Sequence, residues 1–346
     1  MDLQESRLSG SLVQPERMSP LRLAVVGLGA LGSEVARILA LCGAGDLLLI
    51  DPDRIESSNL SRSTLYGPAD IGRLKAEVLV QRLRERCTNI CLHGLTEEIA
   101  DTGWGLLEHR HLIFCCVDRD SARLETARIS TRLGVPMCDG GLGGPRAELG
   151  RVSYFPGKDG ACFCCRLTSA RRRELLAEWQ SQPHPCGGPE SDPVRASTPI
   201  IASVAAGFTV DSGLRALGTT EAFSIDIHLG LHPELHRLSL VQSADCPFHN
   251  HAESPLRPVP TTFAEALAGC ESLRWEWPIC TAAKCLACGH QWTPNLRVAR
   301  LRTSSCPACK QSGILALESL QSITSHSPQV HQSPESLGLP LHHLFF

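Results

Sequence analysis

The stretch Val25–Asp53, "VVGLGALGSEVARILALCGAGDLLLIDPD", decides the fold class. A short apolar run leads into the motif Gly27-x-Gly29-x-x-Gly32, a segment with helical spacing follows, and a second apolar run ends at Asp51. Glycines let a backbone approach phosphates, a helix N-terminus favours their charge, and an acid after the second strand can bind ribose hydroxyls. This order of strand, glycine turn, helix, strand and acid predicts a nucleotide-binding unit.

The same alternation continues along the chain. Residues 70–86 have the spacing of an amphipathic helix with Asp70 as its N-cap, "HLIFCCVD" (111–118) reads as a buried strand, and a helix is expected over 119–134. Further strands are expected at "VPMCD", "RVSYF", "AFSIDIHL" and "LHRLSLVQ". Strands alternating with helices predict an α/β protein with a doubly wound, mostly parallel Rossmann-like sheet and a partly antiparallel extension.

Composition narrows the class of protein. The 346 residues carry a net charge of −3, and no basic run is interleaved with aromatics, so nucleic acid is not expected as a partner. No run approaches the roughly 20 apolar residues of a membrane helix, and the N-terminus has no apolar core typical of a signal peptide. We expect a flexible tail (1–20), a nucleotide-binding domain (21–250) with a long crossover loop (166–198), a linker (251–278), a small cysteine module (279–317) and a flexible C-terminal tail (318–346).

The 17 cysteines indicate metal sites rather than disulfides. Several fall in C-x-x-C pairs and others lie in apolar strands, which favours a reducing compartment, the cytoplasm. Cys285-x2-Cys288 and Cys306-x2-Cys309 have the spacing of a zinc ribbon, in which two thiolate turns complete a tetrahedron. The module at 279–317 is therefore predicted to hold a closed, structural Zn²⁺ site.

Polar residues after the second strand separate this chain from a dehydrogenase. Asn59, Arg62 and Lys75 supply a polar donor and two cations close to a phosphate-binding turn, and Asp118 ends the strand 111–118, where it can hold Mg²⁺. Hydride transfer needs no such set, whereas phosphoryl or nucleotidyl transfer does, because negative charge builds on the phosphates. Taken singly, Arg62 and Lys75 also read as surface cations and Asp118 as a helix N-cap. A nicotinamide-dependent oxidoreductase and a non-catalytic scaffold stay as alternatives.

Four stretches carry a family resemblance: "GLGALGSEVARILALCGAG", "LLLIDPDRIESSNLSRS", "DIGRLKAEVL" and "CCVDRDSARLETARIS". Over residues 21–250 the chain resembles the superfamily of ubiquitin-activating enzymes and bacterial sulfur-carrier adenylyltransferases. The resemblance implies binding of ATP and Mg²⁺ and adenylation of the C-terminal glycine carboxylate of a small β-grasp protein. The implied roles are a nucleotide turn at Gly27, Gly29 and Gly32, a ribose contact at Asp51 with Asp53 nearby, phosphate contacts at Asn59, Arg62 and Lys75, and Mg²⁺ at Asp118.

The resemblance also implies a second Zn²⁺ site and a reactive thiol. Cys162-x2-Cys165 would be closed by Cys246-x2-His249, with His251 as a rival fourth ligand and Cys164 as a bystander. Cys186, in the crossover loop, would accept the acyl group as a thioester and pass it to a conjugating enzyme, although it also reads as an incidental loop cysteine. The alternative product is a thiocarboxylate made with a sulfurtransferase. A homodimer is implied, but the family's arginine before the first strand has no match in "ERMSPLRL".

Overall fold

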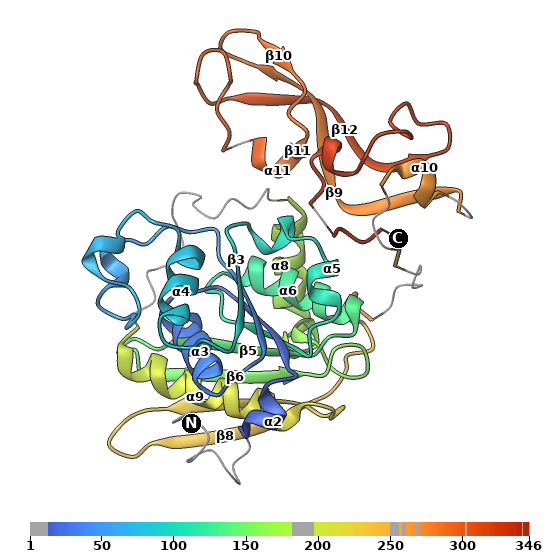
Figure 1. The fold of residues 1–346 in the computed structure, drawn as a ribbon. Coiled ribbons are helices and arrows are strands. Elements are labelled where there is room, and N and C mark those ends of the chain that lie inside the picture. Colours follow the sequence, from blue (N-terminus) through green and yellow to red (C-terminus); the bar gives the residue numbers. More distant parts are fainter. Residues whose placement is uncertain are drawn as a thin grey trace. The chain divides into compact units, whose positions relative to one another are not determined.

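The computed structural model describes residues 13–181, 197–249, 256–257, 261–267, 270–301, 303–340 and 342–345. The chain forms two compact units (Figure 1). The larger spans Met1–Ala100, Leu107–Arg172 and Glu190–His251, and the smaller spans Asp101–Leu106, Arg173–Pro189 and Ala252–Phe346. Within the described part, every helix is too short or too polar to cross a bilayer.

An eight-stranded sheet forms the centre of the larger unit, in the order β3-β2-β1-β4-β5-β6-β7-β8. The strands from β3 to β5 run parallel, and β5, β6, β7 and β8 pair antiparallel. This confirms the predicted doubly wound sheet with an antiparallel extension. The strands are β1 (Arg22–Val26), β2 (Asp46–Ile50), β3 (Cys91–Leu95), β4 (Leu112–Cys115), β5 (Met137–Gly143), β6 (Leu149–Phe155), β7 (Ala222–His228) and β8 (Glu234–Leu240).

Helices cover both faces of this sheet. A Cβ added at Gly140 would meet Leu31 and Thr209, so α3 and α9 lie on one face. The thiol of Cys115 interacts with Thr126, which places α6 on the other face. The helices are α2 (Pro15–Met18), α3 (Ala30–Leu41), α4 (Lys75–Arg84), α5 (Gly105–Glu108), α6 (Asp120–Leu133), α7 (Phe163–Arg166), α8 (Ser169–Ser181) and α9 (Pro199–Ala216), with 3-10 turns η1 (Ser57–Asn59), η2 (Pro68–Asp70) and η3 (Ile99–Asp101).

The expected start of α4 needs a correction. The helix begins at Lys75 with Leu74 as its N-cap, because Gly72 adopts a φ of +86° that interrupts helical geometry. Asp70 instead closes turn η2, where its carboxylate accepts the N–H of Gly67 at 3.0 Å and pairs with Arg73 at 2.9 Å. The residue that we expected to cap the helix thus fixes the loop before it.

The smaller unit contains an antiparallel sheet in which the long strand β9 (Ser272–Cys285) pairs with the other three. These are β10 (Gln291–Trp292), β11 (Leu296–Arg297) and β12 (Ile314–Thr324). Short helical segments accompany the sheet, namely α10 (Phe263–Ala266), α11 (Val298–Leu301) and the 3-10 turn η4 (Glu335–Leu337).

The smaller unit corrects the expected linker (251–278) and C-terminal tail (318–346) where their residues are described. Trp275 at the start of β9 lies 6.1 Å from Phe345, measured between ring centroids, and 6.1 Å from Phe263. All three rings are buried in one apolar core together with Leu337 and Leu339. At the other terminus, α2 buries Met18 within the segment expected to be a tail. Apolar residues in these polar segments pack because partners distant in sequence supply the remaining core.

Candidate nucleotide site and metal centres

The glycine turn joins β1 to α3, and its three glycines meet different structural requirements. A Cβ on Gly32 would lie 1.8 Å from the carbonyl oxygen of Gly27, and a Cβ on Gly27, where φ is +84°, would lie 2.9 Å from the backbone of Cys116. Both positions therefore require glycine for packing. A Cβ on Gly29 would meet nothing within 4 Å. Gly29 also begins α3 without a side-chain cap, so the first N–H groups of the helix remain open to an anionic ligand.

Two side chains hold the central peptide of this turn. The Leu28 N–H donates to Oδ2 of Asp51 at 2.6 Å, and the hydroxyl of Tyr66 donates to the Leu28 carbonyl at 2.8 Å. The second oxygen of Asp51 accepts the N–H of Asp53 at 2.8 Å. Sequence reasoning missed Tyr66, because a single phenol in a polar loop gives no pattern that marks it. The predicted ribose acid therefore also shapes the turn.

Lys75, the first residue of α4, brings a cation to the two acids after β2. Its Nζ lies 2.8 Å from Oδ2 of Asp53 and 3.9 Å from Oδ1 of Asp51, and its side chain is only 10% exposed. Burial lowers the pKa of Lys75, but Asp51 and Asp53 outweigh it, so the net pKa is raised and the ammonium stays charged. Burial raises the pKa of Asp51, and Lys75 opposes that rise. The three groups form one coupled cluster beside the turn.

The other predicted phosphate and Mg²⁺ residues are Arg62, Asp118 and Asn59. Arg62 donates its backbone N–H to Asn59, and its half-buried guanidinium has no partner within the described ranges. Asp118 is exposed after β4 and acts electrostatically on Lys75. Asn59 is the exception, because its side chain accepts the N–H of Glu56 at 3.0 Å and thereby closes turn η1. The open helix terminus and these free charges fit the phosphates of a nucleotide.

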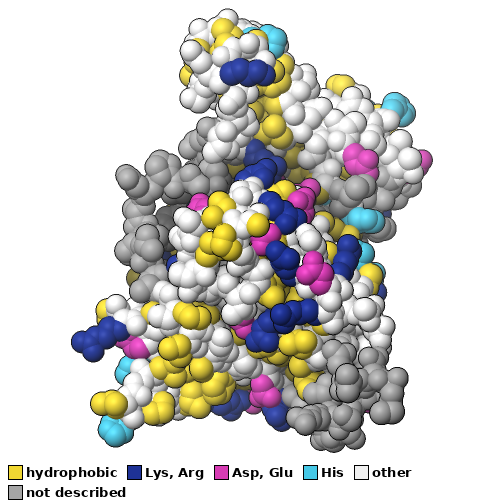
Figure 2. Space-filling view, turned by 60° about the vertical axis from the view of Figure 1, so that its left-hand side comes forward, with side chains coloured by type: hydrophobic (Ala, Val, Ile, Leu, Met, Phe, Trp, Pro, Cys, Tyr) yellow, Lys and Arg dark blue, Asp and Glu magenta, His cyan; other side chains and the backbone are white. Residues whose placement is uncertain are grey.

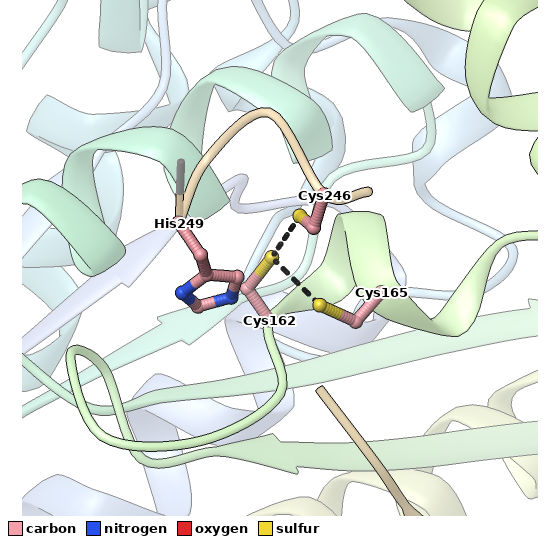
Figure 3. A group of neighbouring side chains, drawn as sticks. All are labelled: Cys162, Cys165, Cys246 and His249. Atoms are coloured by element: carbon pink, nitrogen blue, oxygen red, sulfur yellow. Dashed lines mark hydrogen bonds between the residues drawn. The ribbon is translucent and has the colours of Figure 1, made fainter. Parts of the chain in front are cut away.

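The first metal centre lies in the larger unit, where Cys162, Cys165, Cys246 and His249 converge (Figure 3). The sulfur of Cys162 lies 3.8 Å from that of Cys165 and 3.6 Å from that of Cys246. Tetrahedral Zn–S bonds of about 2.3 Å place sulfurs about 3.8 Å apart. Nε2 of His249 is buried without a hydrogen-bond partner among the described residues. Hydrogen bonds from Cys162, and then from its neighbours, lower the pKa of Cys246, as a thiolate ligand requires.

The second metal centre joins the two C-x-x-C turns of the smaller unit. Sulfur to sulfur, Cys285 lies 3.7 Å from Cys309, and Cys288 lies 3.7 Å from Cys306. The backbone N–H of Cys288 is the main cause that lowers the pKa of Cys285 to about 7. The four sulfur donors match a closed zinc site made only of cysteines. Two predicted residues, Cys186 and the rival ligand His251, lie outside the described residues.

A glycine turn, an acid and a lysine at the carboxyl edge of a mostly parallel sheet define a doubly wound nucleotide-binding protein. The ThiF family model matches residues 8–335, and the chain therefore belongs to the ThiF family. This confirms the resemblance drawn from the sequence. The named relatives are activating enzymes.

Two relatives illustrate the extent of the similarity. The chain is 35% identical over 156 residues to the Nedd8-activating enzyme E1 catalytic subunit of Drosophila melanogaster, covering 41% of this chain and 34% of that protein. It is 29% identical over 164 residues to ubiquitin-like modifier-activating enzyme 5 of Oryza sativa subsp. japonica, covering 43% and 38%. The chain thus spans well under half the length of these relatives.

A solved structure supports the fold. The structure of E. coli MccB with ATP covers 72% of this chain and 74% of its own, with a TM-score of 0.57 and 19% sequence identity. At that identity the likeness concerns the fold alone.

Proposed function

We propose that this protein is an ATP-dependent adenylyltransferase that activates the C-terminal carboxylate of a small ubiquitin-like or sulfur-carrier β-grasp protein ending in glycine. The observation that carries the proposal is the buried ammonium of Lys75, 2.8 Å from Asp53 and beside the glycine turn. The guanidinium of Arg62, which has no partner among the described residues, lies on the connection from β2 to α4 that leads to Lys75. A nicotinamide ring undergoing hydride transfer has no need of two cations, whereas a nucleotidyl transfer has. The named relatives activate Nedd8 and ubiquitin-like modifiers, which agrees with this class.

In the proposed reaction a carboxylate oxygen attacks the α-phosphorus of ATP, and the bond to the bridging oxygen breaks to release pyrophosphate. The open N–H groups at the start of α3 hold phosphate oxygens, and Asp51 accepts hydrogen bonds from the ribose. Lys75 and Arg62 neutralise charge that grows on the leaving pyrophosphate. Mg²⁺, held by Asp118, would add further charge neutralisation there. Binding both reactants in one site makes the attack effectively intramolecular.

The acyl adenylate has two proposed fates. In the first, the thiolate of Cys186 displaces AMP to give a thioester, and a conjugating enzyme then receives the acyl group. In the second, the persulfide of a sulfurtransferase displaces AMP to give an acyl disulfide, and a further thiol reduces this to a thiocarboxylate with formation of a disulfide. The variant Cys186→Ala distinguishes the two fates. In the first it should abolish a covalent protein adduct that reducing agents cleave, whereas in the second the adenylate should still be made and converted.

We also propose two structural Zn²⁺ ions, a homodimer and a cytoplasmic location. The zinc ions follow from the donor sets described above. Apolar side chains are exposed on and beside the edge strand β8, at Leu231, Leu235, Leu238 and Val241, and a second copy would cover them. Figure 2 shows hydrophobic side chains gathered on one face of the larger unit. The 16 cysteines in the described segments are all free, which suits a reducing compartment.

The decisive experiment is ATP–pyrophosphate exchange with candidate β-grasp proteins. We expect exchange that needs both Mg²⁺ and a free terminal carboxylate, and a loss of at least about a hundredfold in Lys75→Ala, because removing a group that stabilises developing charge costs that much. Lys284→Ala, an exposed lysine of the smaller unit, is the matched control. Tight NAD binding, or no exchange with any glycine-ending carrier, would contradict the proposal.

A further inference from the structure

Arg166, the last residue of α7, has an unsatisfied guanidinium. Its side chain is 17% exposed, and its charged end lies 4.9 Å from the centroid of the Phe163 ring. Nε is buried and has no hydrogen-bond partner among the residues that the structure describes. Among the described residues its nearest carboxylate is that of Asp139, whose Oδ2 lies 4.0 Å away, beyond hydrogen-bond distance, while Asp120 and Asp226 interact with it only electrostatically. Because leaving buried donors unpaired is costly, this guanidinium points to a ligand that is still to be bound.

The carboxylates near Arg166 are already paired with other arginines. Arg123 pairs with Asp139 and Asp120, Arg171 pairs with Asp120, and Arg151 pairs with Asp226. Among the described residues, the carboxylates of Asp120, Asp139 and Asp226 thus each pair with another arginine at 3.2 Å or less, and Arg166 is the member of this cluster without a close partner.

The position of this cluster in the sheet selects the kind of anion. Gly140 and Gly150 face α3 and α9, so Asp139 and Arg151, their neighbours in the strands, project from the opposite face. In the sheet order, β4 lies between β1 and β5. The glycine turn follows β1 and Asp118 follows β4, so β5 is next to the strand of Asp118 but not to the strand of the glycine turn. Strands are about 4.8 Å apart. Because Arg166 lies near Asp139 on β5, it is on the side of Asp118 away from the nucleotide turn, which leaves it free for a reactant other than the nucleotide.

An open row of polar residues extends from this point across the antiparallel extension. In the sheet register, Gly141 on β5 lies opposite Arg151 on β6, Arg151 lies opposite Asp226 on β7, and Asp226 lies opposite His236 on the edge strand β8. The side chain of Arg151 is 52% exposed and that of His236 is 65% exposed. The row lies on the face opposite α9 and gives an extended peptide a polar surface that leads toward Arg166.

We propose that Arg166 binds a carboxylate of the acyl substrate, presented by an extended peptide tail that lies along the row Gly141, Arg151 and Asp226. The assignment of this peptide as the substrate rests on the proposed function. A guanidinium donates parallel hydrogen bonds that match the two oxygens of a carboxylate. One carboxylate would also give Arg166 the close anionic partner that no described residue supplies, whereas the phosphates have their own cations in Arg62 and Lys75.

The test measures carboxylate binding directly on the full chain. N-acetylglycylglycine presents a terminal carboxylate, the α-amide of N-acetylglutamate presents a side-chain carboxylate, and inorganic pyrophosphate is the competing anion. In wild type we expect one carboxylate probe to shift the side-chain Nε–H resonance of Arg166 saturably in ¹H–¹⁵N NMR, beyond a sodium chloride control. The probe with the tighter binding identifies which carboxylate the tail presents.

Variants measured by ligand-observed NMR complete the design. Arg166→Gln should weaken the carboxylate probe by about tenfold or more, the effect of losing a charge-assisted hydrogen bond, and Arg166→Lys should weaken it less. Arg215→Gln breaks an exposed ion pair with Asp211 on α9 and should change nothing. Because Arg166 follows Cys165 in the chain, the zinc content of each Arg166 variant is measured to show that the first metal centre is intact. The NMR titration of the wild-type protein does not depend on any variant and therefore tests the inference even if a variant fails to fold.

Three results would overturn the inference: no saturable shift with either carboxylate, a shift with pyrophosphate alone, or unchanged affinity in Arg166→Gln with zinc retained. The proposed function fails separately, by absence of ATP–pyrophosphate exchange while carboxylate binding to Arg166 persists. Conversely, normal exchange in a protein whose Arg166 binds no carboxylate would refute this inference alone.

Discussion

Replacing Lys75 by methionine tests the cluster on which the nucleotide site depends. Methionine keeps an aliphatic stem of similar length but removes the ammonium that lies 2.8 Å from Asp53 and 3.9 Å from Asp51. Asp51 is buried at 4% exposure, so in the variant its carboxylate loses the cation that compensates its burial. We expect both weaker ATP binding and a less stable larger unit.

The expected size follows from the geometry. At the 3.9 Å separation of Lys75 and Asp51, two unit charges attract by about 4 kcal/mol at an effective dielectric constant of about 20. The variant recovers part of this because it no longer buries an ammonium, so the net loss in free energy of unfolding should be about 2–4 kcal/mol near pH 8. Lys284→Met, at an exposed position on β9, should change stability by less than about 0.5 kcal/mol.

The pH dependence makes the prediction specific. Burial raises the folded-state pKa of Asp51, and removing Lys75 raises it further. A carboxyl group with a raised folded-state pKa loses stability as the pH rises from its unfolded value of about 3.9 through the folded value. The cost of Lys75→Met should therefore be largest at pH 8 and shrink as the pH falls toward 4, because Asp51 becomes protonated first in the folded state and, below about pH 3.9, in the unfolded state as well. Urea unfolding followed by circular dichroism measures it, and a cost independent of pH would refute the reasoning.

Three further predictions follow from the same structure. Gly32→Ala should impair folding, because its Cβ would lie 1.8 Å from a carbonyl oxygen, whereas Gly29→Ala should fold normally and lose ATP affinity in calorimetry, since its Cβ meets only open space. The purified chain should contain two zinc ions by mass spectrometry, and Cys306→Ser should retain one, bound by the first centre. Phe345→Ala should destabilise the smaller unit by about 3–5 kcal/mol in thermal unfolding, because the ring is fully buried, and an unchanged transition would show that the C-terminal segment is not part of its core.

The start of the chain was predictable because its signals are local. β1 and β4 each bury four consecutive residues in the middle of the sheet, so their sequences read as unbroken apolar runs. The edge strand β3 gave no such signal. Its sequence "CLHGL" exposes Cys91 and His93 and includes a glycine, and its conformation comes from pairing with β2 rather than from its own pattern.

The structure of the C-terminal region, in contrast, could not be predicted from its local sequence. Its Pro, Ser and His content is typical of a disordered tail, yet Leu337, Leu339 and Phe345 are buried. Their partners Phe263 and Trp275 lie at least 60 positions earlier in the chain. Local composition cannot show such a pairing, because the core forms only when β9 and β12 come together.

Asp51 shows why the same glycine motif can serve different chemistries. As a sequence feature, an acid after the second strand is a ribose ligand in nicotinamide sites and in the site proposed here. In this structure its two oxygens already accept the N–H groups of Leu28 and Asp53, while Tyr66 holds the Leu28 carbonyl. The acid therefore builds the turn before any nucleotide binds, and only its remaining lone pairs are available to a ribose. What distinguishes the proposed chemistry is the cation beside it, because Lys75 pairs with Asp53 next to this shared turn, and Arg62 lies on the connection that leads from Asp53 to Lys75.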